Sequence, residues 1–271
     1  AALVWFRRDL RCEDHAALYH ALRTAQKVYC VFIFDTDILN ALPSRKDRRV
    51  EFIHQSVLAL DAGLHALSLQ AGGQGSGLIV RYGAARDCIP ELARQLGVQK
   101  VFTNRDYEPL AIARDQRVAA SLDVMGIGFA DFKDQVVFET HEVLTQAGKP
   151  YSVFTPYKNA WLKKVDDFQL KAYPVEKYAA RLASKPRGES IPSLEQMGFE
   201  SGTWASLSMP AGSSGAQTLF EDFATRMARY KEARDFPAVK GVSYLSVHIR
   251  FGTVSVRKLA RFALQHNNDG A

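Results

Sequence analysis

Long apolar runs, paired cysteines and metal-binding patterns are what this 271-residue sequence lacks. None of its apolar runs reaches the roughly 18 residues that a membrane span needs, so we expect no membrane association. Its three cysteines, Cys12, Cys30 and Cys88, are scattered without CxxC spacing, which is typical of reduced thiols in a cytoplasmic protein. The seven histidines never form an HExxH pattern, so the sequence predicts no metal site.

The glycine-rich patterns that bind phosphates in nucleotide-binding proteins are also absent from their usual context. The segment GGQGSG (72–77) precedes an expected strand, whereas the dinucleotide fingerprint joins a strand to a following helix, whose N-terminus receives the pyrophosphate. No GxxxxGK[ST] pattern follows any expected strand. We therefore interpret 72–77 as a flexible connector.

What the first half contains is a regular alternation of apolar runs and helical patterns. Strands are expected at 1–6, 27–34, 78–83, 100–107 and 127–134. The first four are almost continuously apolar, as parallel strands buried on both faces are. Apolar residues at three- and four-residue steps predict helices at 16–25, 48–69, 89–96 and 111–125. This order predicts a doubly wound, Rossmann-like α/β domain with a five-stranded parallel sheet, whose ligands should lie beyond the carboxyl ends of the strands.

A less regular stretch, 134–215, follows the α/β domain, which we bound at 1–133. It is broken by prolines at 150, 156, 174, 186, 192 and 210. Helical patterns are weak, near 140–146 and 156–165, and the Gly/Ser-rich stretch 209–216 closes it. We interpret it as a long connector laid over the surface rather than a third core.

Helical patterns resume in the last part of the chain, 216–271. Two apolar faces are formed by Leu219, Phe220, Phe223 and Met227 and by Val256, Leu259, Ala260 and Ala263. Two helices and a turn are too little for an independent core, so we expect this second domain to be incomplete. The same part carries nine Lys/Arg against five Asp/Glu, most of the net charge of +6. Such an excess favours an anionic partner, with a solvated helix face as the alternative.

Four motifs resemble a known family, in order and spacing, from end to end of the chain. They are WFRRDLR (5–11), TNRDYEP (103–109), KPYSVFTPYKNAW (149–161) and RDFPAVKGVSYLSVHIRFGTVSVR (234–257). They resemble the photolyase/cryptochrome flavoproteins, most of all bacterial class I deoxyribodipyrimidine (CPD) photolyases. The resemblance implies an antenna-binding α/β domain followed by the start of an all-α FAD-binding domain. Family members are usually much longer, so we expect most of the flavin domain to lie outside this chain and its flavin retention to be weak.

The segment after residue 240 is the expected flavin site. Read alone, Ser243 and Ser246 near a helix start either cap backbone N–H groups or offer hydroxyls to a phosphate. The resemblance implies that Ser243, Leu245 and Ser246 contact the FAD phosphates and that Tyr230 does likewise. Val242 stands where many relatives place threonine, which removes one hydroxyl.

Basic residues beside this segment are the expected DNA contacts. Arg234 follows Tyr230 by one helical turn, so both should project from one side. The resemblance implies that Arg234 holds the DNA backbone around the lesion; a solvent-exposed arginine paired with a neighbouring carboxylate is the alternative. Further candidates for the same surface are Arg229, Lys240 and Lys158.

A second chromophore is expected where the fourth strand ends. In folate-using relatives a glutamate at the place of Glu108 binds the pterin ring, whereas Asp106 and Arg49 match antenna contacts of deazaflavin-using relatives. Both patterns are present; we favour methenyltetrahydrofolate and keep deazaflavin as the alternative. The cluster Arg7, Arg8, Asp9 and Arg11 is interpreted as structural, pairing with the connector.

The resemblance implies light-driven repair of cyclobutane pyrimidine dimers by electron transfer from reduced FAD, with UV-damaged DNA as partner and a monomeric protein. The alternative is a cryptochrome-type blue-light photoreceptor. The chain shows no catalytic triad or carboxylate pair, as expected where the protein positions a cofactor that carries the chemistry. We do not interpret Trp5, Trp161 and Trp204 as the family's electron relay, which is expected beyond Ala271.

Overall fold

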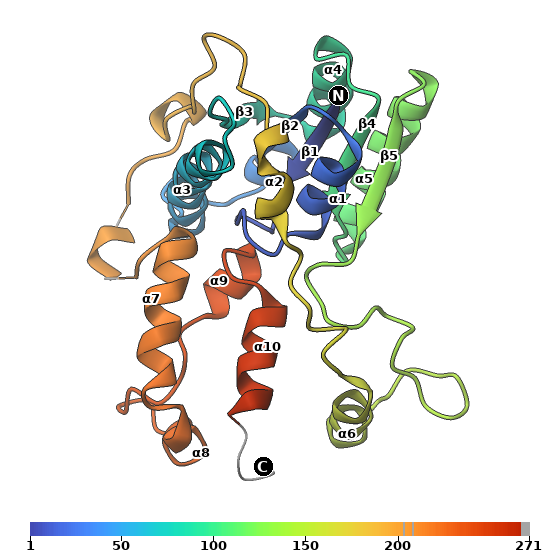
Figure 1. Cartoon of the computed structure of the whole chain (residues 1–271). Coiled ribbons are helices and arrows are strands. Elements are labelled where there is room, and N and C mark those ends of the chain that lie inside the picture. Colours follow the sequence, from blue (N-terminus) through green and yellow to red (C-terminus); the bar gives the residue numbers. More distant parts are fainter. Residues whose placement is uncertain (203, 208, 267–271) are drawn as a thin grey trace.

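A parallel sheet of five strands forms the centre of the protein. The computed structural model describes residues 1–202, 204–207 and 209–266. The strand order is β3-β2-β1-β4-β5, and every neighbouring pair is parallel (Figure 1). The strands are β1 (Ala2–Phe6), β2 (Val28–Asp35), β3 (Leu78–Gly83), β4 (Lys100–Asn104) and β5 (Gly128–Phe132). The five-stranded α/β prediction is therefore confirmed.

Helices cover both faces of this sheet and continue below it. The α-helices are α1 (Ala16–Thr24), α2 (Thr36–Leu39), α3 (Arg48–Gln70), α4 (Ala85–Gln95), α5 (Pro109–Val124), α6 (Phe154–Lys164), α7 (Gly212–Ala224), α8 (Tyr230–Ala233), α9 (Ser246–Phe251) and α10 (Val256–Gln265). Short 3-10 helices are η1 (Val175–Arg181), η2 (Glu195–Met197), η3 (Trp204–Leu207) and η4 (Met227–Arg229).

Alternate residues of the strands enter two separate cores. In β1, Val4 and Phe6 pack with α1 and α3, whereas Leu3 and Trp5 pack with α4 and α5. Successive side chains of a strand point to opposite faces, so a strand covered on both sides reads as one apolar run. The order of the strands reverses between β1 and β4, which makes the carboxyl ends of these two strands the crevice for a ligand.

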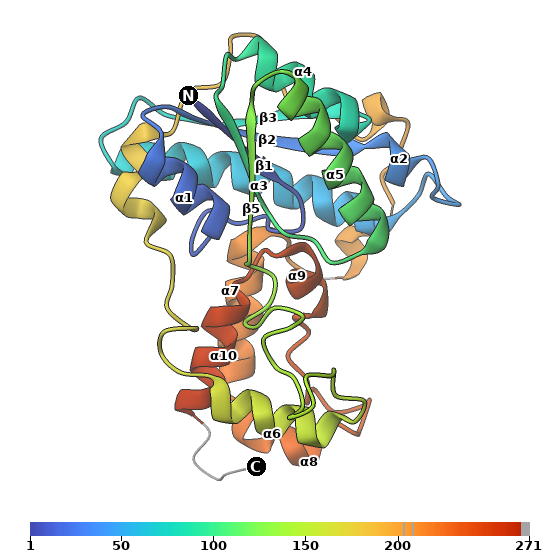
Figure 2. The ribbon, with the colours of Figure 1, turned by 90° about the vertical axis from the view of Figure 1, so that its right-hand side faces the viewer.

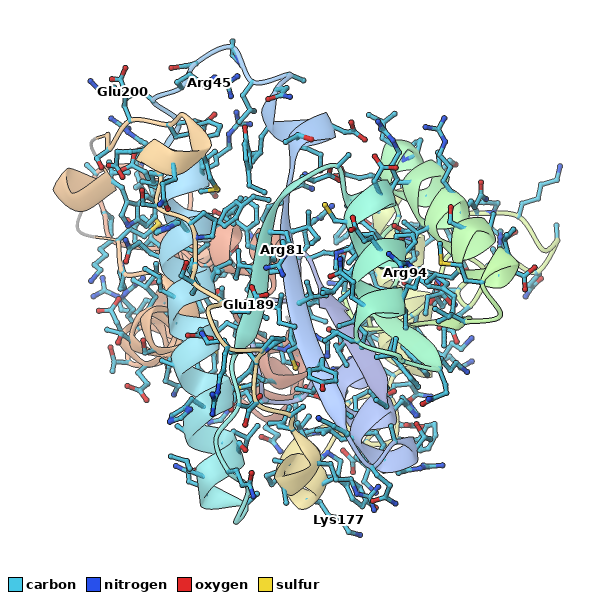
Figure 3. All side chains as sticks on the ribbon, turned by 90° about the horizontal axis from the view of Figure 1, so that it is seen from above. Arg45, Arg81, Arg94, Lys177, Glu189 and Glu200 are labelled. Atoms are coloured by element: carbon cyan, nitrogen blue, oxygen red, sulfur yellow. The ribbon has the colours of Figure 1, made fainter. Side chains whose placement is uncertain are left out.

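The second half of the connector is part of the first core, not only a surface segment. Six of its apolar residues are buried with α1, α3 and the sheet: Val175, Ala179, Leu182, Leu194, Met197 and Phe199. Lys185 pairs with Asp61 of α3, and Glu189 pairs with Arg81 of β3, which Figure 3 shows side by side. The expected surface connector is therefore corrected for 175–199, whose apolar residues are too irregularly spaced to signal a core contribution.

The first half of the connector has a small core of its own, which was not expected. Val137, Phe138, Val143 and Leu170 are buried together, and Trp161 of α6 packs against them. The helix expected over 156–165 is confirmed as α6, but the residues of the weak pattern over 140–146 form turns.

The Gly/Ser-rich stretch before α7 is not a linker. Gly212 is the first residue of α7, and a Cβ there would lie 2.7 Å from the Ala59 side chain of α3. A Cβ on Gly215 would lie 2.6 Å from the carbonyl carbon of Pro210. These glycines allow close contact between α7 and its neighbours, so the helical part begins four residues earlier than we expected.

The helices α6 to α10 lie on the side of the sheet towards which the strands point, as the arrow of β5 shows in Figure 1 and the side view confirms (Figure 2). The carboxyl ends of β1 and β4 therefore face the C-terminal helices. Leu10 N donates to Phe251 O (3.1 Å), and Arg11 Nη1 donates to Gly252 O (3.1 Å). The crevice of the α/β domain and the end of α9 are thus in direct contact.

Four buried charges join α10 to the α/β domain. Arg257 of α10 lies 2.9 Å from Asp14 and 2.8 Å from Asp134, and Arg11 lies 2.6 Å from the other oxygen of Asp134. Burial raises the pKa of Asp134, but the charges of Arg11 and Arg257 outweigh it and hold that pKa well below its usual range. We call these four residues the buried joint.

Candidate functional site

The loop after β1 is held by side chains of the α/β domain itself. Arg7 pairs with Asp115 of α5 and donates to Asn104 O, and Asn104 Nδ2 donates to Asp9 (2.8 Å). Asp9 lies 3.0 Å from His15; burial raises the Asp9 pKa, but His15 outweighs it and lowers that pKa. The structural interpretation of this cluster agrees with these contacts.

Among the described residues, one member of that cluster has the connector as its ionic partner. Arg11 pairs with Asp134, the first residue of the connector as we bounded it, whereas Arg7 pairs within the α/β domain. Arg8 pairs with Asp106 and Glu108 after β4. The expectation that the whole cluster pairs with the connector was therefore wrong for Arg7, Arg8 and Asp9.

The residues expected to bind a second chromophore are each engaged with another protein side chain. Glu108 Oε1 accepts from Arg250 Nη1 of α9 (2.6 Å) and lies 2.9 Å from Arg8 Nη1. The hydrogen bond from Arg250 lowers the Glu108 pKa, and Arg8 adds to the shift. The Asp106 side chain is buried, 3.3 Å from Arg8.

Arg49, at the start of α3, is held by a different carboxylate. Asp47 is the N-cap of α3, and its Oδ2 lies 2.5 Å from Arg49 Nη2. In the described part of the chain, no hydrogen bond or ion pair joins Arg49 to Asp106 or Glu108. Arg49 is therefore held by the residue that caps its own helix.

The expected flavin segment is a bend that is open on its outer side. Val242, Tyr244 and Ser246 are exposed, Ser243 is half-buried, and only Leu245 turns inward. Tyr244 has a φ of +56°, the left-handed region, which turns the chain sharply before α9. The bend, residues 242–246, therefore carries one exposed serine, Ser246, and one half-buried serine, Ser243.

The two serines lie at a helix start and just before it, as expected. α9 begins at Ser246, Ser243 precedes it by three residues, and the Ser243 hydroxyl accepts from Leu245 N (3.4 Å). The side chain of Leu245 is 2% exposed, so any contact of Leu245 with a ligand must come from its backbone. Tyr244, between the two serines, is left-handed and therefore lies outside the helix.

Arg226 holds the bend in place, and sequence reasoning missed it. Its guanidinium donates to Lys240 O (2.9 Å) and Val242 O (2.8 Å) and pairs with Asp222 one helical turn earlier. Asp222 also accepts from Lys240 Nζ (2.9 Å). The four-residue spacing of Asp222 and Arg226 is typical of an ion pair on a helix. It does not indicate that the arginine also donates to backbone carbonyls fourteen and sixteen residues later.

An aromatic–cation pair lies next to the bend on the short helix α8. The Arg234 guanidinium lies 5.6 Å from the centre of the Tyr230 ring, so the two residues project from one side, as predicted. Tyr230 is 40% exposed and packs its edge against Phe223 of α7. Arg234 lies 3.7 Å from Asp235, the neighbouring carboxylate of the alternative interpretation.

The remaining basic candidates are all exposed, but they are not one cluster. Arg229 precedes α8, and Lys240 precedes the bend. Lys158 lies on α6, which Figure 1 places on the opposite side of α10 from α8, at the same end of the molecule. The structure thus brings Arg229, Arg234 and Lys240 to one side and leaves Lys158 across from them.

Comparison with known proteins identifies the family. The model of the DNA photolyase family matches residues 2–177. The deoxyribodipyrimidine photo-lyase of Halobacterium salinarum is 33% identical over 98% of this chain and 55% of its own length. The chain belongs to the DNA photolyase family. It spans about half the length of this photo-lyase.

Two further relatives bear on function. Cryptochrome-1 of Arabidopsis thaliana is 29% identical over 94% of this chain and 37% of its own length. The crystal structure of an archaeal photolyase from Sulfolobus tokodaii, described as containing two FAD molecules, is 26% identical, with a TM-score of 0.72. It aligns with 99% of this chain and 56% of its own. The fold and the resemblance to photolyases and cryptochromes are thus confirmed.

No helix within 1–202, 204–207 and 209–266 is both long and apolar enough to cross a membrane.

Proposed function

We propose that this chain supplies the α/β domain and part of the flavin site of a light-driven DNA repair protein that acts on cyclobutane pyrimidine dimers. The observation that carries the proposal is the open bend, residues 242–246, next to the exposed pair of Tyr230 and Arg234. Gly241, just before the bend, packs closely against Ala233 of α8. Hydroxyl donors near a cation suit a phosphate-bearing cofactor near a polyanion. The names of the photo-lyase relatives support the same function.

The bend fits the phosphates of FAD. Because the Ser243 oxygen accepts from Leu245 N, its O–H remains to donate to a phosphate oxygen. The exposed hydroxyls of Ser246 and Tyr230 are further donors. Arg226 contributes by fixing the carbonyls of the bend, so the donors are arranged before the ligand arrives. Bound in its reduced form, FAD supplies the electron that splits the dimer.

The DNA contacts proposed are Arg234, with Arg229, Lys240 and Lys158 as further members. All four side chains are exposed. A cation that neutralises a phosphate releases a counterion, so each real contact should steepen the dependence of affinity on salt. Lys240 already pairs with Asp222, and its contribution should be the smallest.

A second chromophore at Glu108, Asp106 and Arg49 stays a prediction. Glu108 and Asp106 are paired with arginines, and Arg49 is paired with Asp47. The repair function that we propose does not depend on a second chromophore, because reduced FAD absorbs near-UV and blue light itself.

The second candidate function is a blue-light receptor, favoured by the similarity to Cryptochrome-1. The two functions share the flavin and differ in what happens to DNA. A protein that contains this chain, loaded with reduced FAD, should lower the amount of dimers in UV-irradiated DNA under blue light and not in the dark. Ser243→Ala should weaken FAD binding, whereas Ser201→Ala, an exposed serine of the connector, should not. Bound, reduced flavin without any loss of dimers would exclude repair and favour the receptor.

A further inference from the structure

The Glu108 carboxylate connects two parts of the molecule that are 142 residues apart in sequence. Its Oε1 atom accepts from Arg250 on α9 and pairs with Arg8 on the loop after β1. Arg8 in turn donates from Nε to Arg250 O (3.2 Å). We call Arg8, Glu108 and Arg250 the clasp. One oxygen thus contacts two guanidinium groups, one from the loop after β1 and one from α9.

The backbone beneath the clasp fixes the end of α9. Leu10 N donates to Phe251 O and Arg11 Nη1 donates to Gly252 O. Gly252 has a φ of +64°, and a Cβ there would lie 2.2 Å from Arg8 O. The two chain segments therefore approach more closely than any residue with a side chain allows, and α9 has little freedom at this end.

The other end of α9 is the bend. The helix has only six residues, Ser246–Phe251, and its first residue is the last of the bend. A movement of Arg250 therefore displaces Ser246 within one and a half helical turns. Arg226 holds the start of the bend through Val242 O, and the clasp holds Arg250 near the end of α9. The segment 242–251 is therefore fixed near both of its ends.

We propose that Glu108 is a positioning residue for the bend, acting through Arg250, rather than a ligand of a second chromophore. The proposal rests on the proposed flavin site, since the bend has a function only if it binds a ligand. Glu108 and Arg250 are each about half exposed. The attraction between their charges is therefore weak and is screened by salt. We therefore expect the loss of the clasp to loosen α9 without unfolding the chain.

The first test measures amide hydrogen exchange in the 271-residue chain without any ligand. Glu108→Gln and Arg250→Gln should each speed exchange of the Ile249 and Gly252 amides about two- to fivefold at low salt, and the double variant no further. Arg250→Lys, which keeps the charge, should lie near the wild type. Asp37→Asn is the matched control, because Asp37 forms an equally exposed pair with Arg86 far from α9.

The second test makes the same substitutions in a protein that contains this chain and titrates each variant with FAD and with methenyltetrahydrofolate. We expect Glu108→Gln and Arg250→Gln to weaken FAD binding by a similar factor, with the difference lost at high salt and the urea midpoint unchanged. Unchanged exchange in both variants overturns the clasp, whatever FAD does. So does a loss of folate affinity in Glu108→Gln with no change in exchange. Faster exchange together with no FAD binding by any variant, the wild type included, would instead overturn the flavin site and leave the clasp.

Discussion

Replacing Asp134 with asparagine tests how the two parts of the chain are held together. Asp134 is fully buried, and its two oxygens accept from Arg257 and Arg11. Asparagine has the same shape but no charge, and its amide N–H₂ would face one of the two guanidinium groups. The change therefore leaves buried positive charge that is only partly compensated, because Arg257 keeps Asp14.

The size of the effect follows from the burial of the joint. Removing one partner of a buried ion pair costs about 3–5 kcal/mol, and we expect about 3 kcal/mol here because Asp14 remains. With an m-value of about 3 kcal/mol/M in urea, the midpoint should fall by about 1 M. Asp37→Asn, which breaks an exposed pair with Arg86, should cost less than about 1 kcal/mol.

The pH dependence of the folding stability is a second, independent test of the role of the Asp134 charge. Because the folded state holds the Asp134 pKa below its ordinary value, the unfolded chain binds the proton first, and stability falls as the pH drops through about 4. The asparagine variant lacks this group, so its deficit should shrink between pH 5 and pH 3. Urea unfolding followed by circular dichroism measures both effects. A deficit below 1 kcal/mol, or one that stays constant with pH, would refute the idea that the joint works through the charge of Asp134.

Three further predictions address the connector, the DNA contacts and the bend. Phe199→Ala should cost about 3–5 kcal/mol in urea unfolding, because Phe199 is 2% exposed in the first core; a cost below 0.5 kcal/mol would return the connector to the surface. Arg234→Ala should weaken DNA binding and reduce the slope of log affinity against log salt by about 1, and an unchanged slope would exclude a phosphate contact. Val242→Thr should tighten FAD binding about two- to tenfold by adding one hydrogen bond. No gain would mean that the exposed Val242 side chain does not face the cofactor.

The α/β half could be predicted because its signals are local. Buried parallel strands appear as apolar runs, and the stripes of the helices repeat within a few residues, so the sheet needed no distant contact to be recognised. Phe199 and Leu194 could not be assigned to the core in this way, because isolated apolar residues between prolines show no period. The glycines of 212–215 suggested a linker, although they serve close packing against α3 and Pro210.

The same difference between local patterns and distant contacts applies to the candidate site. Tyr230 and Arg234 are one turn apart, and the spacing alone correctly predicted that they lie together. Glu108 pairs with Arg250, which is 142 residues away in the sequence, and no local pattern predicts such a contact. The left-handed conformation of Tyr244 could not be predicted from the sequence, because it is rare for a residue with a side chain.

The central claim, that this chain is part of a flavin-dependent repair protein, is tested most directly by measuring dimers in UV-irradiated DNA. A protein that contains these 271 residues, with FAD bound and reduced, is illuminated with blue light, and the dimers are counted against a dark control. We predict a loss of dimers only in the light. Dimers that persist under light with the reduced flavin in place would contradict the claim.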